Sequence, residues 1–429
     1  ILIPQLQKEF AVTIKRRSPF IGRRSLWWLS GTVVAVLASL LWVSMDTPAD
    51  AGRPSAEQRR RPNGERPRPP VKRGQQIFRY DTFGDEAHWT DTLRMHEVIQ
   101  QAIDPVTALS LGLKVDVEAL PEEIVSALVA GEVDLTDPAT TLTLLEHDAV
   151  VGLVGTVEEV DGARTLTKIG ITCALCHSTV DDSLVPGIGR RLDGWANADL
   201  DPGAIIAASP AITDEQREVY LSWGPGIYDP RFNIDGINSP IVIPPAYGLK
   251  GIAKETFTGD GSVSYWNRYV AVTQMGGQGI FVDPRLGIRV IRFPDRVHSK
   301  LPALLAYQLS LETPAPPDDS VDQELADEGE LLFHAVGCAD CHIPPFYTDI
   351  NLGILHDAED VGQDPTYAAR TITGKYRTTP LRGLWQHAPY FHDGSAETLL
   401  DVVDHYDTHL ELQLAPEEKV AIAEFLKTL

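Results

Sequence analysis

Two short cysteine motifs constrain this chain more than any other feature of its sequence. Cys173-Ala-Leu-Cys176-His177 and Cys338-Ala-Asp-Cys341-His342 contain all 4 cysteines of the 429 residues. Each C-x-x-C-H supplies two thiols for thioether bonds to haem vinyl groups and an imidazole for the iron. A zinc site would pool the two pairs, and a redox-active dithiol would not need the histidine. The motifs therefore predict two covalently bound c-type haems with His177 and His342 as proximal ligands.

Charge divides the chain into a basic start and an acidic remainder. Residues 1–73 carry 14 Lys and Arg against 5 Asp and Glu, so residues 74–429 carry 23 against 55. A strongly acidic folded part disfavours nucleic acid as a partner, and it would attract a small basic redox protein that donates electrons. The same acidity is also common as a solubility feature.

The basic start contains one long apolar segment. Leu26 to Val43 has no charged residue and follows Lys15, Arg16, Arg17, Arg23 and Arg24. As a helix it would be about 27 Å long, which suits a bilayer core. With residues 1–25 as a basic cytoplasmic segment, 26–43 is expected to be a retained membrane anchor or an uncleaved signal. Residues 44–73, rich in Pro and Arg, are expected to be a linker. This places the haems on the periplasmic side of a bacterial inner membrane, where the electron donor is either soluble or membrane-bound.

Beyond residue 73 the same landmarks occur twice in the same order. Each copy has a G-x-x-x-F segment, its C-x-x-C-H, a Pro-x-x-Gly-Leu turn, an Asp-Gly-Ser turn and a closing helix. In the first copy these are Gly74–Phe78, 173–177, Pro245–Leu249, Asp260–Ser262 and Lys300–Leu311; in the second they are Gly329–Phe333, 338–342, Pro380–Leu384, Asp393–Ser395 and Lys419–Leu429. The repetition predicts two tandem haem domains.

The expected domains are 74–312 and 321–429, joined by a Pro-rich linker at 313–320. An insertion at about 84–168 separates the first landmark from the first haem motif, with helical stretches at Trp89–Ile103 and Pro121–Ala130 and a strand at Val150–Val160. The expected fold is mainly α: two cytochrome-c-like domains, a helical insertion in the first and an N-terminal membrane helix.

The second copy closely resembles the C-terminal haem domain of the bacterial dihaem cytochrome c peroxidase and MauG family. The shared features are the G-x-x-x-F helix, the haem motif and the run Tyr376-Arg-Thr-Thr-Pro380-Leu-Arg-Gly-Leu384 leading to Ala388-Pro-Tyr-Phe-His-Asp-Gly-Ser395. The first copy is a divergent match. The rubber oxygenases are a second group with a similar two-haem plan. The resemblance implies electron entry at haem 2, reduction of hydrogen peroxide at haem 1, and possible calcium between the domains.

The sixth ligand of haem 2 cannot be the usual methionine, since no Met follows Met275. The family's ligand position, counted from Ser395, falls on Tyr406, as in MauG-type proteins. His405 is adjacent and is intrinsically the stronger ligand. Both residues remain candidates for the sixth ligand. The third alternative is that both are ordinary helix residues and that the sixth position of haem 2 is open.

For haem 1, no histidine lies between His177 and His298, so the loop histidine of the peroxidases is absent. The iron is then either open to a small oxidant or capped by Met275. Gln274 and Gln278 are expected as hydrogen-bond donors to a bound peroxide. Trp266 and Trp385 are the family-based candidates for an aromatic bridge. Six histidines without a motif are expected to be core or surface residues: His88, His96, His147, His334, His356 and His387.

The sequence therefore predicts a dihaem peroxidase-type oxidoreductase. Two alternatives stay open. One is a membrane-tethered electron carrier with both irons six-coordinate, and the other is a dihaem oxygenase or protein-modifying oxidase.

Overall fold

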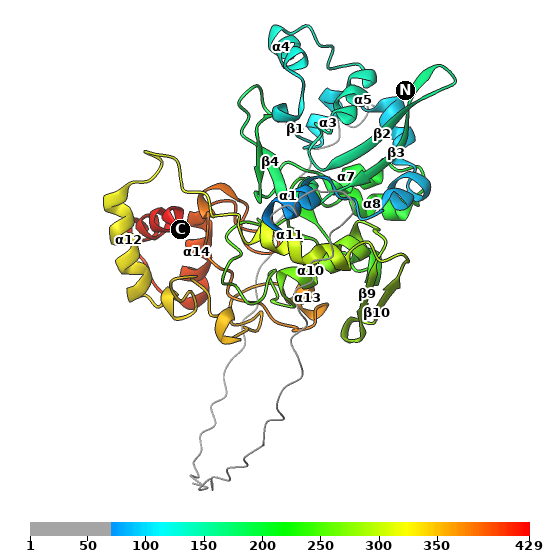
Figure 1. Cartoon of the computed structure of the whole chain (residues 1–429). Helices are drawn as coiled ribbons and strands as arrows, with labels where there is room; N and C mark the ends of the chain where they lie inside the picture. The colour runs from blue at the N-terminus through cyan, green and yellow to red at the C-terminus, as the bar shows by residue number, and fades with distance from the viewer. Residues whose placement is uncertain (1–69) are drawn as a thin grey trace, which may run out of the picture. The chain divides into compact units, whose positions relative to one another are not determined.

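The computed structural model describes residues 70–429, which belong to one compact unit (Figure 1). This unit is mainly helical and contains five two-stranded sheets. The predicted membrane span at 26–43 and most of the 44–73 linker lie outside the described residues. Within 70–429, no helix has the length and apolar character needed to cross a membrane.

The first repeated landmark forms a helix crossing. Helix α1 (Pro70–Tyr80) packs against α11 (Leu301–Gln308), and Gly74 lies at the contact. A Cβ atom on Gly74 would lie 1.9 Å from the carbonyl oxygen of Ala303. Phe78, one turn further on, is fully buried and its ring meets the ring of Tyr307 edge-on at 5.5 Å. The glycine therefore allows the two backbones to touch, while the phenylalanine fills the core beside them.

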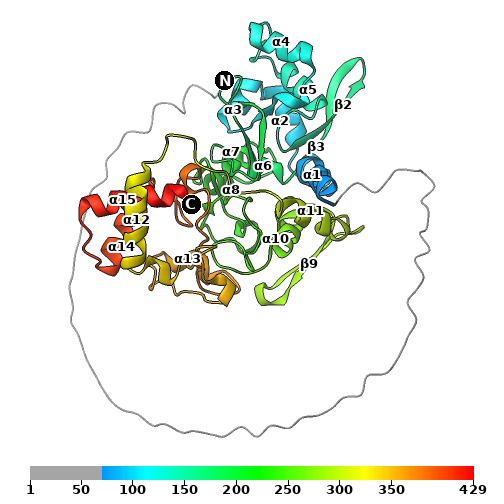
Figure 2. The ribbon, with the colours of Figure 1, turned by 60° about the vertical axis from the view of Figure 1, so that its left-hand side comes forward.

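The second landmark builds the same crossing. Helix α12 (Gln323–Ala335) packs against α15 (Pro416–Thr428), and α14 (Leu399–Leu410) lies beside them (Figure 2). A Cβ on Gly329 would again lie 1.9 Å from a carbonyl oxygen, that of Ala421. Phe333 packs on Phe425, with ring centroids 5.3 Å apart. The same type of glycine-mediated helix crossing thus occurs in both copies of the repeated landmarks.

The segment at 84–168 folds as helices and a hairpin around its own apolar core. The helix predicted over Trp89–Ile103 is in fact interrupted, because Arg94 adopts a left-handed backbone with φ of 56°. The predicted strand at 150–160 begins later and pairs antiparallel with the strand after it. Its elements are the π-helix η1 (Ala87–Thr92), α2 (Met95–Ala102), α3 (Pro105–Ser110), β1 (Val115–Asp116), η2 (Val117–Ala119), α4 (Glu122–Ala130), α5 (Pro138–Glu146), β2 (Leu153–Val160) and β3 (Ala163–Ile171).

The rest of the described chain consists of short elements and loops. Many of its helices start at an Asp, Ser or Thr whose side chain accepts from the first turn, such as Ser262 and Thr398. Between the first haem motif and α11 lie α6 (Ala174–His177), β4 (Ser178–Val180), β5 (Ile188–Gly189), β6 (Arg191–Asp193), α7 (Pro202–Ala207), α8 (Asp214–Leu221), β7 (Ile227–Tyr228), α9 (Phe232–Asp235), β8 (Ile241–Val242), α10 (Val263–Tyr269), the π-helix η3 (Val270–Gln274), β9 (Ile280–Asp283), η4 (Pro284–Leu286), β10 (Ile288–Ile291) and η5 (His298–Lys300). After α12 come η6 (Cys338–Asp340), η7 (Ile350–Leu352), α13 (Pro365–Ala369) and η8 (Leu384–Gln386).

The two Pro-x-x-Gly-Leu turns meet each other. The Tyr247 hydroxyl donates to the Gly383 carbonyl at 3.1 Å, and the Arg382 guanidinium donates to the Gly248 carbonyl at 2.6 Å. Tyr247 and Arg382 hold the same position in the two copies, as do Gly248 and Gly383, and both glycines have φ near 60°. Equivalent residues therefore exchange equivalent bonds, as across a two-fold axis.

Candidate haem site

Both cysteine motifs open onto one cavity of about 980 Å³. The first motif ends at α6 and the second at η6, and both copies of the Pro-x-x-Gly-Leu turn contribute to the wall. The remaining wall comes mainly from apolar side chains of η1, α7, η3 and α14. A mostly apolar cavity with a few polar groups is the usual environment of a cofactor. Its volume and its walls leave room for large apolar groups beside each motif.

The two motif histidines are held in the same way. His177 Nδ1–H donates to the Pro244 carbonyl at 3.0 Å, and His342 Nδ1–H donates to the Tyr347 carbonyl at 3.0 Å. Burial lowers the pKa of His177 to about 4 and also lowers the pKa of His342, so both rings are neutral near pH 7. A fixed Nδ1–H leaves the Nε2 lone pair free, which is the arrangement of an iron ligand.

The thiols fit covalent haem attachment better than a metal or redox site. Burial raises the pKa of Cys173 to about 12 and that of Cys338 to about 11, whereas zinc ligands and reactive dithiols need readily formed thiolates. Among residues 70–429, one group of three possible metal-binding side chains exists: Cys341, Asp349 and His356. It does not combine the two cysteine pairs, as the zinc reading requires.

The two candidate sixth ligands of haem 2 lie in different surroundings. Tyr406 lines the cavity, and its pKa rises to about 12 through burial and through the nearby Cys341 and Cys338 thiols. His405 is absent from the cavity wall and its Nε2–H donates to the Val361 carbonyl at 3.1 Å. The next residue along a helix points about 100° away, so only one of the two can face the haem. The geometry favours Tyr406.

Three of the residues predicted around haem 1 lie on the cavity wall. They are Trp266 in α10, Gln274 at the end of η3 and Met275 directly after it. The Gln274 side chain is fixed, because its Oε1 accepts from the Tyr228 hydroxyl at 2.9 Å and its Nε2 donates to Thr273 at 2.9 Å. Met275 is 3% exposed.

Two other predicted residues lie away from that wall. Gln278 packs against Gly84 and is not part of the cavity lining. Trp385 meets Trp195 edge-on at 5.6 Å and donates to the Pro314 carbonyl at 3.1 Å, again outside the lining. The structure therefore brings Trp266, Gln274 and Met275 together and separates Gln278 and Trp385 from them.

Sequence reasoning missed several cavity residues. His88, His356 and His387 line the cavity although no motif surrounds them, and so does Tyr228, whose pKa burial raises well above its ordinary value. His356 bonds to Asp349 at 2.8 Å, and burial lowers the pKa of His387 to about 4. His88 precedes the haem motif, so a search restricted to the residues after His177 could not find it. No sequence signal distinguishes it from the other histidines.

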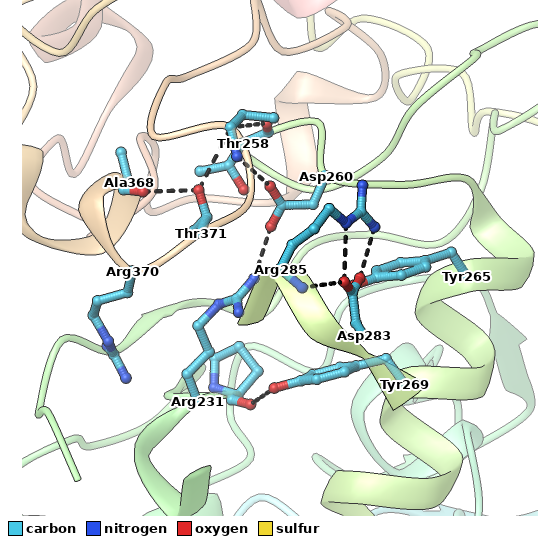
Figure 3. A network of polar contacts seen from close by, with 12 residues as sticks. Arg231, Thr258, Asp260, Tyr265, Tyr269, Asp283, Arg285, Ala368, Arg370 and Thr371 are labelled. Atoms are coloured by element: carbon cyan, nitrogen blue, oxygen red, sulfur yellow. Dashed lines mark hydrogen bonds and ion pairs between the residues drawn. The ribbon is translucent and has the colours of Figure 1, made fainter. Parts of the chain in front are cut away.

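A buried ionic network joins the region around α9 and α10 to the loop after α13 (Figure 3). Arg231 pairs with Asp260 at 2.7 Å, and both side chains are at most 3% exposed. Arg370 pairs with Asp229 at 2.9 Å and with Asp235 at 2.8 Å. These carboxylates already have guanidinium partners, so they do not form the free oxygen cage that calcium requires. Calcium between the domains stays a prediction, and this network does not provide a site for it.

Comparison with known proteins gives three findings. Residues 374–408 match the family model described as RoxA-like, cytochrome c-like. The chain is similar to hydrazine synthase of Kuenenia stuttgartiensis, with 19% identity, coverage of 49% of this chain and 78% of that one, and a TM-score of 0.35. It is also similar to a MauG-like protein associated with microbial copper homeostasis, with 19% identity, coverage of 45% and 74%, and a TM-score of 0.32. No curated protein matches significantly. The family match places a cytochrome c-like segment directly before and within α14, which carries Tyr406.

Proposed function

We propose that the chain is a dihaem c-type oxidoreductase in which the first haem site reacts with a small oxidant and the second relays electrons to it. The observation that supports this is the asymmetry of one shared cavity. Each motif histidine donates a hydrogen bond to a backbone carbonyl. The second motif also has a buried phenol, Tyr406, close to its thiols. The first motif also has a buried phenol near a thiol, Tyr228 near Cys176, but the Tyr228 hydroxyl already donates to Gln274 Oε1 at 2.9 Å.

Cys173 and Cys176 would hold one haem and Cys338 and Cys341 the other, with His177 and His342 as the iron ligands. When bound, these haems supply one-electron chemistry and, at an open coordination position, activation of a small oxidant. The protein residues set which position is open. The Pro244 and Tyr347 carbonyls fix the two imidazoles, Tyr406 closes the second site, and the Tyr228–Gln274 bond orients an amide in the first.

Hydrogen peroxide is the proposed substrate, and the electrons come from a small redox protein or a membrane donor. Residues 74–429 carry 23 Lys and Arg against 55 Asp and Glu, which supports a small basic redox protein as the donor. A location on the periplasmic side of the membrane, with an N-terminal anchor, remains part of the proposal.

The test is ligand binding by the purified dihaem protein, followed by absorption and paramagnetic resonance. We expect cyanide to perturb only the haem on Cys173 and Cys176. Tyr406→Phe should change the spectrum of the other haem and slow peroxide turnover, because a six-coordinate site loses its ligand. His405→Ala is the matched control, since its ring bonds to Val361 and should leave both spectra unchanged.

Opposite results have definite meanings. Cyanide binding at the haem on Cys338 and Cys341 alone would reverse the two roles. If neither haem binds cyanide, the electron-carrier reading replaces the enzyme. A spectral change in His405→Ala without one in Tyr406→Phe would transfer the ligand role to His405.

A dihaem oxygenase is a second candidate, favoured by the RoxA-like match at 374–408. The cavity wall beside the first motif includes Ile205, Ile206 and Ile212, which would suit an apolar organic substrate. Oxygen uptake without an added electron donor would select this candidate. Peroxide consumption that depends on a donor would select the peroxidase.

A further inference from the structure

We propose that His88 is the proton-transfer residue of the first haem site, acting on the oxidant from the cavity wall formed by η1 and η3. The inference deepens the proposed function and rests on it. It concerns a residue that precedes its haem motif by more than 80 positions and belongs to the segment whose role the sequence left open.

The position of His88 on the cavity wall supports the inference. Three residues of η1 and the residue after it line the cavity: His88, Trp89, Thr92 and Leu93. Trp89 Nε1–H donates to the Met275 carbonyl at 2.9 Å, which fixes η1 against the end of η3. His88 packs directly on Gly276, where a Cβ atom would lie 2.5 Å from the His88 Cβ and 2.9 Å from its Cδ2. The imidazole is therefore held against Gly276, which directly follows the cavity-lining Met275.

The π-helical backbone of η1 and η3 also supports the inference. Within residues 70–429 the structure has two π-helical turns, η1 and η3, and Trp89 of η1 donates to the carbonyl of Met275, the residue directly after η3. A π-turn widens the helix and is costly, and such turns occur frequently at functional sites. Here one carries His88 and the other carries Gln274. Both departures from the α-helix thus place a polar side chain on the same cavity wall.

The hydrogen bonding of the His88 ring favours a role in proton transfer over a role as an iron ligand. A histidine that ligates a metal almost always donates its other ring N–H to a carbonyl or carboxylate. His177 and His342 do so. Among the described residues the His88 ring has no such hydrogen bond, and neither ring nitrogen is a buried atom lacking a partner. A ring with both nitrogens free to exchange protons suits an acid–base role.

The proposed step is the cleavage of the O–O bond of hydrogen peroxide, with His88 moving one proton. His88 takes the proton from the inner oxygen of hydrogen peroxide and gives it to the outer oxygen, so that the O–O bond breaks and the outer oxygen leaves as water. Two electrons from the redox-protein donor, entering through the second site, and two protons from solvent convert the remaining oxygen to a second water. His88 ends in the protonation state in which it began.

The experiment uses the full dihaem protein and hydrogen cyanide, which must lose its proton to bind ferric iron and therefore reports a distal base without turnover. In His88→Ala we expect cyanide association to slow at least tenfold, with the resting paramagnetic resonance spectrum unchanged and added imidazole restoring the rate. His88→Gln should be slow as well. His147→Ala, a histidine in the same segment but away from the cavity, is the control and should match the wild type.

Wild-type cyanide rates in His88→Ala overturn the inference and leave the proposed function intact. A change from low-spin to high-spin iron in that variant also overturns it, because His88 would then be a ligand. If the wild-type protein does not bind cyanide at all, both the inference and the proposed function fail.

Discussion

The two regions that carry the C-x-x-C-H motifs share a type of helix crossing and differ in the side chains that line the cavity. In both, a glycine lets an opening helix touch a closing helix, at Gly74 against Ala303 and at Gly329 against Ala421. In both, the motif imidazole donates to a backbone carbonyl. Beyond these features, the second site has Tyr406 from α14, whereas the first has side chains from η1 and η3.

The difference shows where the fold is fixed and where it can vary. Backbone contacts such as the glycine crossings tolerate no added atom, so any chain that uses this scaffold must keep them. Side chains that face the cofactor can change without disturbing those contacts. The 84–168 segment, which has no counterpart in the second region, delivers η1 to the first site. The insertion thus gives the first region cavity-lining side chains that the second region lacks.

The largest expected effect is loss of a haem. Replacing Cys338 and Cys341 by Ala should remove one covalent haem, and replacing Cys173 and Cys176 should remove the other, because each pair supplies the thioether bonds of one site. Mass spectrometry of the intact chain measures the loss. If either double variant keeps both haems, the equivalence of the two motifs is wrong.

The next effect concerns the junction of the two regions. Arg370→Ala leaves the buried carboxylate of Asp229, which is fully covered, without its cation, so we expect a loss of about 3 to 5 kcal/mol in unfolding free energy. Lys375→Ala removes an exposed pair with Asp357 and should cost about 1 kcal/mol or less. Denaturant titration of both variants decides whether the regions unfold together or separately.

The glycine crossings test the shared scaffold. Gly74→Ala and Gly329→Ala each place a methyl group on a backbone oxygen, and each should destabilise the protein by about 2 to 3 kcal/mol. Glu330→Ala, one residue beyond Gly329 and exposed, is the control and should have little effect. Equal losses in the two glycine variants support equivalent crossings. A loss in only one would show that the two regions pack differently.

The smallest effect is a pH dependence of stability to which the buried His387 of the second region contributes. Burial lowers the pKa of His387 to about 4, below the ordinary value of 6.5, so the folded state holds this ring neutral. As the pH falls from 6.5 to 4 the unfolded state binds a proton that the folded state does not, and stability decreases by about 2 kcal/mol. His387→Gln should reduce this decrease. Thermal unfolding between pH 7 and pH 4 measures it, and identical pH profiles would rule out the buried neutral ring.

Part of the candidate site could be predicted because it is encoded by short local spacings. The C-x-x-C-H motifs place two thiols and an imidazole within one turn of chain, where backbone geometry limits the possible distances. Tyr406 and Trp266 were predicted instead from the resemblance to the peroxidase and MauG family. Gln274 and Met275 were predicted from their place in the first copy, where no histidine is available.

The helix stretch at Trp89–Ile103 was predicted less well. Its apolar spacing fits one helix, but Arg94 turns left-handed and separates η1 from α2. η1 packs against β3 and against the loop after η3, and no local pattern reveals these contacts. The choice between Tyr406 and His405 likewise depended on which side of α14 faces the cavity.

The sequence by itself contains the repeated order of landmarks and predicts two haem attachments with His177 and His342 as proximal ligands, because these features are local in the chain. Only the tertiary structure decided that Tyr247 and Arg382 exchange bonds between the copies, that both motifs open onto one cavity, and that His88 lies beside Gly276. These features join residues more than 100 positions apart. Their distances are set by the packing of whole elements, and a linear pattern carries no information about that packing.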